Sequence, residues 1–161
     1  MGSSNKLLIS KTATKELDHL SSRLGLRPNL VCRLAIGKSL TIPESVKAYT
    51  RLEDEADCKD TVPKEFNRFT LTGEYDEIYR ILIFQHEFEY GKKKISEQLY
   101  FKGYFLKHIE RGLDLLYAEY VKINSPVAFL GSLVNPNADK QGKDKKKESS
   151  TEGKSQTSLD V

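Results

Sequence analysis

The sequence predicts a mainly α-helical protein with one short strand near its start. Its 161 residues suit a single domain that can bury a core. Apolar side chains recur at helical spacing through much of residues 12–123, whereas only residues 6–10 form a short β-prone run. From residue 135 onward the chain is too polar to bury enough surface to offset its ordering entropy. We therefore expect a domain over residues 1–134 and a disordered Lys/Ser-rich tail over residues 135–161.

Two helices are predicted directly after the strand. Residues 12–24 carry one apolar stripe, formed by Ala13, Leu17, Leu20 and Leu24. Gly25 follows as a typical C-terminal glycine, and Pro28 suits the first turn of a second helix, where its missing N–H costs nothing. That helix ends before Pro43. Its predicted buried face consists of Leu30, Val31, Leu34, Ala35 and Leu40.

Strand, helix, glycine turn and helix, in this order, form a ribbon-helix-helix-like unit. A single strand is an unpaired edge, so we expect a second chain to supply an antiparallel partner and the protein to be oligomeric. A two-stranded ribbon fits the DNA major groove, and the start of the second helix offers N–H groups to a phosphate. A helical hairpin with an ordinary solvated basic face is the alternative interpretation.

The rest of the domain is predicted to be a helical extension. Residues 44–65 look irregular, and a third helix with acidic residues in its first turn begins near Glu74 and frays near residues 90–94. A fourth helical region covers about residues 95–123, where Gly103 and Gly112 predict a bend or a close approach. Residues 124–134 are apolar and form a short closing segment.

Charge is distributed unevenly along the chain. Residues 1–43 carry seven Lys/Arg against two acids, residues 44–90 have a net charge of −6, and residues 91–161 a net charge of +4. A basic N-terminal unit suits contact with phosphate. Leu8, on the strand, offers no hydrogen bond to a base edge, so backbone binding is favoured over base readout. The candidate DNA-binding residues are Lys6, Lys11, Lys15, Arg23 and Arg27.

Several classes of function lack support in the sequence. It has no Gly-rich phosphate loop, no cofactor motif and no nucleophile with an evident base, so we expect no catalytic residue, no cofactor and no metal. Two cysteines, Cys32 in an apolar helix and Cys58 in an acidic loop, fit a reducing cytoplasm. No apolar stretch is long enough to span a membrane, and we expect a cytoplasmic protein.

Three segments resemble the DndE family of DNA phosphorothioation proteins. They are residues 24–35 (LGLRPNLVCRLA), 65–76 (EFNRFTLTGEYD) and 108–113 (HIERGL), and the resemblance covers roughly residues 6–115. The middle segment is the most specific of the three. The part of the chain that follows, with its lysine-rich tail, is longer than the family pattern.

The resemblance implies a role in replacing a non-bridging phosphate oxygen of DNA by sulfur. It implies a small subunit, assembled as a homotetramer of ribbon-helix-helix-like chains, that binds duplex DNA, nicked DNA included. The implied partners are a cysteine desulfurase, an iron-sulfur protein and an ATPase. Gly25 would then lie near the oligomer contact.

Three alternatives remain open from the sequence. A metal-dependent DNA nickase could use Glu65, Glu74, Asp76 and Glu77, or His108 with Glu110 and Arg111, although helix-dipole and packing roles explain these residues. A ribbon-helix-helix transcription regulator would be shorter than this chain. An assembly adaptor could bind through the aromatic residues of segment 100–105, Tyr100, Phe101, Tyr104 and Phe105, which more often form core.

Overall fold

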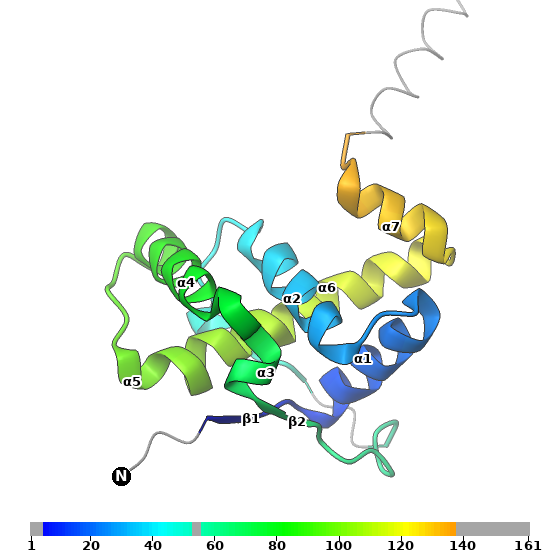
Figure 1. The fold of residues 1–161 in the computed structure, drawn as a ribbon, viewed down its shortest axis with the longest axis horizontal. Coiled ribbons are helices and arrows are strands. Elements are labelled where there is room, and N and C mark those ends of the chain that lie inside the picture. The colour runs from blue at the N-terminus through cyan, green and yellow to red at the C-terminus, as the bar shows by residue number, and fades with distance from the viewer. Residues whose placement is uncertain (1–4, 53–55, 138–161) are drawn as a thin grey trace, which may run out of the picture. The chain divides into compact units, whose positions relative to one another are not determined.

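The computed structural model describes residues 5–52 and 56–137 of the chain. The chain forms two compact units, residues 1–122 and residues 123–161. Figure 1 shows a mainly helical first unit with a small two-stranded sheet. Among the helices in the described part of the chain, none has the length and apolar character needed to cross a membrane.

The N-terminal unit has the predicted order of elements, β1 (Lys6–Leu8), α1 (Lys11–Leu24) and α2 (Pro28–Leu40). The Ser10 hydroxyl accepts a hydrogen bond from the Ala13 N–H and so caps α1. Gly25 ends α1 at a φ of 65°, a conformation that glycine adopts without steric cost. Pro28 occupies the first turn of α2, as predicted.

The strand β1 finds its partner within the same chain. It pairs antiparallel with β2 (Glu65–Asn67), with Leu7 opposite Phe66. The prediction that β1 needs a second chain as its partner is therefore wrong. The sequence pattern hid this pairing, because residues 65–67 merge into the helical segment that follows and β2 is only three residues long.

After β2 the chain forms α3 (Arg68–Thr72), a 3-10 turn (Gly73–Tyr75) and α4 (Asp76–Gly91). The Asn67 side chain caps α3 by accepting from the Phe69 N–H. Gly73 has a φ of 59°, and it turns the chain between α3 and α4. The predicted third helix is thus α4, and it ends near the expected place, at Gly91.

The predicted fourth helical region consists of three pieces. They are α5 (Glu97–Leu99), a π-helical segment (Tyr100–Phe105) and α6 (Leu106–Ile123). Gly103 lies inside the π-helical segment, which is the interruption that its low helix propensity predicts. In the described part of segment 44–65, a 3-10 turn covers Val46–Ala48 and β2 begins at Glu65.

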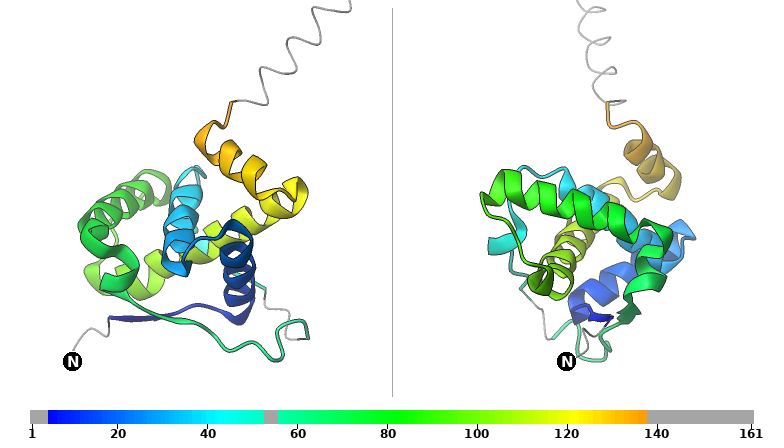
Figure 2. Two further views of the ribbon diagram at one scale, coloured as in Figure 1. Left: turned by 45° about the vertical axis from the view of Figure 1, so that its right-hand side comes forward. Right: turned by 60° about the vertical axis from the view of Figure 1, so that its left-hand side comes forward.

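Helices α2 and α6 cross in the first unit (Figure 2). A Cβ atom at Gly112 of α6 would lie 1.8 Å from the Ala35 carbonyl oxygen of α2, so only glycine allows the two backbones to approach this closely. The largest fully buried apolar side chains of this unit are Tyr100, Phe105, Leu7, Ile9, Leu17, Leu20, Ile36, Leu71, Ile83, Ile109 and Leu113.

Helix α4 buries the less apolar of its two faces. Its buried residues are Ile83, His86 and Glu87. Four of its apolar side chains are 43–65% exposed, lie three, four or seven positions apart on one side of the helix, and are Ile78, Ile81, Leu82 and Phe88. We call these four residues the exposed α4 face. On α2, Leu30 and Leu34 are also exposed rather than buried as predicted, because Val31, Cys32 and Ala35 occupy the side that packs on the core.

The second unit contains α7 (Pro126–Val134), which matches the predicted closing segment. The Ser125 hydroxyl caps it by accepting from the Ala128 N–H, and Pro126 occupies its first turn. The predicted disordered tail falls outside the described residues from position 138 onward, as do positions 53–55 of the acidic loop.

Candidate functional site

The five candidate DNA-binding residues fall into two groups on the N-terminal unit. Lys6 lies on β1, and Lys11 and Lys15 lie in the first half of α1. Arg23 is in the last turn of α1, and Arg27 directly precedes α2. Twelve residues of helix separate Lys11 from Arg23, about 18 Å along the axis. The candidates therefore lie at opposite ends of α1 rather than in one cluster.

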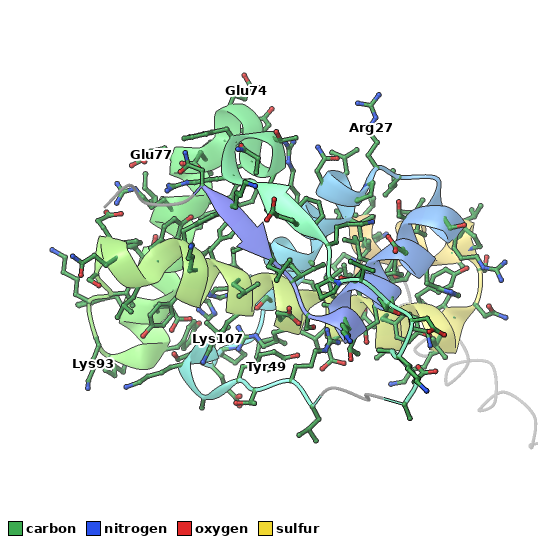
Figure 3. All side chains as sticks on the ribbon, turned by 90° about the horizontal axis from the view of Figure 1, so that it is seen from below. Arg27, Tyr49, Glu74, Glu77, Lys93 and Lys107 are labelled. Atoms are coloured by element: carbon green, nitrogen blue, oxygen red, sulfur yellow. The ribbon has the colours of Figure 1, made fainter. Side chains whose placement is uncertain are left out.

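Arg23 and Arg27 flank the glycine turn, and both are exposed. The N–H groups of Gly25 and Leu26 both bond to the Ser21 carbonyl, which fixes the turn. The Arg27 side chain makes no capping hydrogen bond to α2 and projects outward from the molecule (Figure 3). This end of the unit presents two long cationic side chains beside the start of a helix.

Lys6 and Lys15 are both engaged in ion pairs. Lys6 Nζ lies 3.0 Å from a Glu65 oxygen across the β1–β2 ladder. Lys15 Nζ lies 2.5 Å from a carboxylate oxygen of Asp57, and this hydrogen bond raises the pKa of Lys15. Both pairs are at the surface, where such interactions contribute little to stability. A competing phosphate could replace either carboxylate at low cost.

A further set of exposed lysines follows α4. Lys92, Lys93 and Lys94 are consecutive and exposed, and Figure 3 shows Lys93 far from Arg27. Lys107 of α6 donates to the Lys47 carbonyl at 2.6 Å, so these two lysines are neighbours. These residues were not among the sequence candidates, which were chosen for their place in the basic N-terminal unit.

A cluster of buried ionisable side chains surrounds Glu87 of α4. Its carboxylate accepts hydrogen bonds from the Ser45 hydroxyl and from the Val46 N–H at 3.1 Å. Burial alone would raise the pKa of Glu87, but these bonds and the one with His108 lower it to about 2. Glu87 is therefore an ionised carboxylate in the protein interior.

Two histidines meet this carboxylate. Glu87 Oε1 lies 3.1 Å from His108 Nε2 and 3.3 Å from His86 Nδ1. The second nitrogen of each ring is also held, His86 Nε2 by the Ile42 carbonyl at 2.8 Å and His108 Nδ1 by the Ser39 hydroxyl at 2.9 Å. Burial lowers the pKa of His108.

Arg111 completes the network from the next turn of α6. Its guanidinium donates to the Ser39 hydroxyl and to the Ser39 and Glu44 carbonyls, with distances of 2.8 to 2.9 Å. Burial lowers the pKa of Arg111. Together with the close approach at Gly112, the network ties α6 to α2 and to the segment that follows α2.

Glu110 belongs to a second buried cluster, at the start of α1. Its two carboxylate oxygens accept from the Ser10 N–H at 2.7 Å and the Ser10 hydroxyl at 2.8 Å. Arg51 contacts both Glu110, at 3.5 Å, and Glu16, at 2.5 Å. Burial raises the pKa of Glu16 to about 7, with Arg51 opposing the shift. The HIERGL segment is therefore a set of internal packing contacts.

The acidic residues considered for nicking are not gathered around a common point. Asp76 forms a two-pronged pair with Arg68, at 2.9 Å for each bond. Glu77 pairs with Arg80, and Glu65 with Lys6. Figure 3 shows Glu74 and Glu77 at the surface. The one group of His, Cys, Asp and Glu side chains in the described residues whose geometry could hold a metal ion is His86, Glu87 and His108.

The aromatic segment is mainly core, as its spacing favoured. Tyr100, Phe101 and Phe105 are buried, and Tyr104 is half-buried. Arg68 stacks over Tyr100 and Phe101, at 5.5 and 5.2 Å from the ring centres. Cys32 is buried as expected, and burial raises its pKa to about 12. Cys58 lies in a loop as expected, and its side chain is buried as well.

Sequence reasoning missed the meeting of His86 with His108. They are separated by 22 positions and lie on different helices, so no spacing motif connects them. One local signal was available, because His86 and Glu87 share a side of α4 with the apolar Ile83. If that side is buried, its polar groups require hydrogen-bond partners from other elements.

The fold and these sites define a small, mainly helical protein with basic side chains on a strand–helix–helix unit and a buried network of ionisable residues. Residues 6–125 match the family model described as DNA sulphur modification protein DndE. The chain belongs to the DndE family, as the resemblance of its three segments predicted.

The chain is similar to the crystal structure of DndE from Escherichia coli B7A, described as involved in DNA phosphorothioation modification. The identity is 21%, the similarity covers 70% of this chain and 95% of that chain, and the TM-score is 0.45. The search of curated proteins found no match.

Proposed function

We propose that this protein is a non-catalytic DNA-binding subunit of a DNA phosphorothioation system. The single observation that carries the proposal is the family match over residues 6–125. In this role the protein holds duplex DNA, intact or nicked, by its phosphate backbone while partner proteins replace oxygen by sulfur. The partners proposed from the family are a cysteine desulfurase, an iron-sulfur protein and an ATPase.

The basic side chains of the N-terminal unit support backbone binding. Arg23 and Arg27 are exposed on either side of the glycine turn, close to the start of α2. Lys6 and Lys15 can exchange their surface carboxylate partners for phosphates at small cost. Lys11 lies one helical turn before Lys15 and adds a further cation. Contacts of this kind give binding that depends steeply on salt concentration.

The environment of the ionisable residues supports a role without catalysis. The carboxylates of Asp76 and Glu77 are committed to arginines, and Glu110 is committed to Ser10 and Arg51. The buried network around Glu87 joins three parts of the fold and is enclosed by protein. A nickase would instead present carboxylates to an exposed phosphodiester.

An oligomeric assembly, a homotetramer by analogy with the family, is part of the proposal. Monomeric soluble proteins rarely expose contiguous apolar surface of this kind without using it. The exposed α4 face has four large apolar side chains on one stripe of a helix, a typical feature of a contact surface. Gly25 remains the second proposed contact, at the exposed turn after α1.

A mobility-shift titration on intact, nicked and single-stranded DNA at two salt concentrations tests the function. We expect salt-sensitive duplex binding. The R23A/R27A variant should reduce the slope of log affinity against log salt by about two units, one for each lost phosphate contact. The K93A/K94A variant, which removes the same charge elsewhere, should keep the wild-type slope.

A plasmid relaxation assay in magnesium separates this proposal from catalysis. We expect no relaxation of supercoiled DNA by the wild-type protein. Metal-dependent relaxation that disappears in a carboxylate variant would make the protein a nickase. If the wild-type protein bound none of the three DNA forms, the DNA-binding proposal would be overturned in favour of an assembly adaptor.

A further inference from the structure

His86 and Glu87 meet in a buried contact whose charge balance depends on a cation. The Ile42 carbonyl can only accept a hydrogen bond, so His86 Nε2 carries a proton and donates it. In a neutral ring the remaining nitrogen, Nδ1, then has a lone pair. That lone pair faces the Glu87 carboxylate oxygen at 3.3 Å, and two acceptors at this distance repel each other unless a proton on the ring nitrogen or a metal ion lies between them.

His108 completes a set of three ligand atoms. His86 Nδ1, Glu87 Oε1 and His108 Nε2 all lie within 4.8 Å of one another. The two nitrogen-to-oxygen distances are 3.3 and 3.1 Å. Around a tetrahedral ion with bonds of about 2.0–2.1 Å, neighbouring ligand atoms are about 3.3 Å apart, so the two nitrogen-to-oxygen distances fit such an ion.

The surroundings match the outer shell that metal-binding histidines use. A ligating histidine commonly donates its other ring N–H to a carbonyl or another acceptor, which fixes the ring. The Ile42 carbonyl does this for His86. Ser39 Oγ has two lone pairs and can accept from His108 Nδ1 as well as from Arg111. In that tautomer His108 Nε2 has a lone pair for a metal ion, which then replaces the hydrogen bond between Nε2 and Glu87. Val46 N–H orients the Glu87 carboxylate in the same way.

We propose that His86, Glu87 and His108 form a binding site for a divalent transition-metal ion of the zinc type. Two imidazole nitrogens and one carboxylate oxygen are a ligand set that zinc accepts. The ion joins α4 to α6 and supplies a positive charge between His86 Nδ1 and the Glu87 carboxylate. Arg111 and His108 both hydrogen-bond to the Ser39 hydroxyl, so a positive charge lies near the site. Its repulsion makes metal binding weaker than at a site built from thiolates. This inference does not depend on DNA binding.

Metal binding by the untagged full-length protein tests the proposal. After removal of metal with a chelator, zinc titration should show one ion per chain. The Tm should rise by about 5–10 °C at a free zinc concentration about 100 times the Kd. Cobalt substituted for zinc should give the visible absorption bands of a low-coordinate nitrogen–oxygen site. Absence of all three signals in the wild-type protein would overturn the proposal.

Glutamine variants identify the ligands. H86Q and H108Q should each weaken zinc binding by at least about 100-fold, since each removes a direct ligand. H19Q is the matched control, because His19 is the remaining histidine of the three in the chain, lies on α1 and packs edge-on against Tyr117. This substitution should leave the zinc affinity unchanged. Equal affinity in H86Q and wild type, or loss in H19Q, would contradict the site. The cobalt spectrum of the wild-type protein decides the question if the variants fail to fold.

Discussion

Gly112 shows how one residue can fix the distance between two helices. Its missing side chain lets the backbone of α6 lie against the Ala35 carbonyl of α2. The same crossing brings His108 and Arg111 within reach of Ser39 on α2. The buried network and the helix crossing therefore depend on the same short segment of α6.

The Gly112→Ala variant should be destabilised by about 3 kcal/mol or more, because the new methyl group meets a backbone carbonyl that cannot move independently of its helix. Chemical denaturation measures the change. Gly37→Ala is the matched control: it lies in α2 with no heavy atom within 4 Å of the added Cβ, and it should gain about 0.5–1 kcal/mol in helix propensity. Similar stability of the two variants would contradict the close crossing.

Glu16 makes stability depend on pH. Its pKa in the folded protein is about 7, above the ordinary value of 4.5, chiefly because it is buried. Between these two values the folded state holds more protons than the unfolded state. The contribution of Glu16 to the free energy of unfolding should therefore be largest at and below pH 4.5. This contribution should fall by up to about 3 kcal/mol as the pH rises to 7.

The Glu16→Gln variant should lose this part of the pH dependence, since an amide does not titrate and can still accept a hydrogen bond from Arg51. Urea denaturation of wild type and variant at several pH values between 4.5 and 8 measures the two slopes. Identical slopes would show that Glu16 titrates at its ordinary pKa in the folded protein.

At the scale of elements, Arg68 joins β2, α3, α4 and the π-helical segment. It follows Asn67 at the end of β2, binds Asp76 at the start of α4 with two hydrogen bonds, and stacks over Tyr100 and Phe101. Planar, two-pronged contacts of this kind cannot be reproduced by lysine. The middle family-like segment, residues 65–76, thus contains both Arg68 and Asp76, which bind each other.

The Arg68→Lys variant should be less stable by about 1–2 kcal/mol, from loss of the second hydrogen bond and of the stacking. Arg80→Lys offers a comparison, because Arg80 also makes two hydrogen bonds to one carboxylate, Glu77, and lies over the Phe84 ring. The side chains of its partners Glu77 and Glu97 are 63% and 66% exposed, against 20% for Asp76, so its pairs should contribute less than about 0.5 kcal/mol. Thermal or denaturant unfolding of both variants measures the difference. Equal losses would mean that Arg68 behaves as an ordinary surface residue.

At the scale of the whole molecule, the distribution of apolar residues indicates association. The exposed α4 face has a large apolar area while the opposite side of the same helix buries His86 and Glu87. A helix of a monomer normally turns its apolar face to the core. The pairing of β1 with β2 removes the need for a second chain at β1, so the proposed oligomer contact moves from the ribbon to the exposed α4 face.

The I78E/L82E variant should shift the protein from oligomer to monomer, because it places two charges on the surface that the proposed contact would bury. Light scattering after size-exclusion chromatography gives the mass. V62E serves as the control, since Val62 is 80% exposed in the segment before β2 and its substitution should leave the oligomer intact. A monomeric wild-type protein, or an oligomeric I78E/L82E variant, would contradict this contact.

The sequence by itself determined the features that depend on neighbouring residues. The left-handed Gly25 and Pro28 in the first turn of α2 follow from local backbone chemistry, and helical spacing predicted most of the helices. The family was also identifiable from three short segments. The structural role of each segment was not identifiable from the sequence. The residues of HIERGL, for example, make internal contacts with partners on other elements.

Only the tertiary structure decided which distant residues meet. The partner of β1 is a three-residue strand almost sixty positions away, too short to have a pattern of its own. The side of α4 that is buried was set by the pairing of His86 and Glu87 with His108, which outweighs the simple rule that apolar faces turn inward. Hydrogen bonds and ion pairs between distant segments are selected by packing geometry, and a linear pattern of residue types does not contain that geometry.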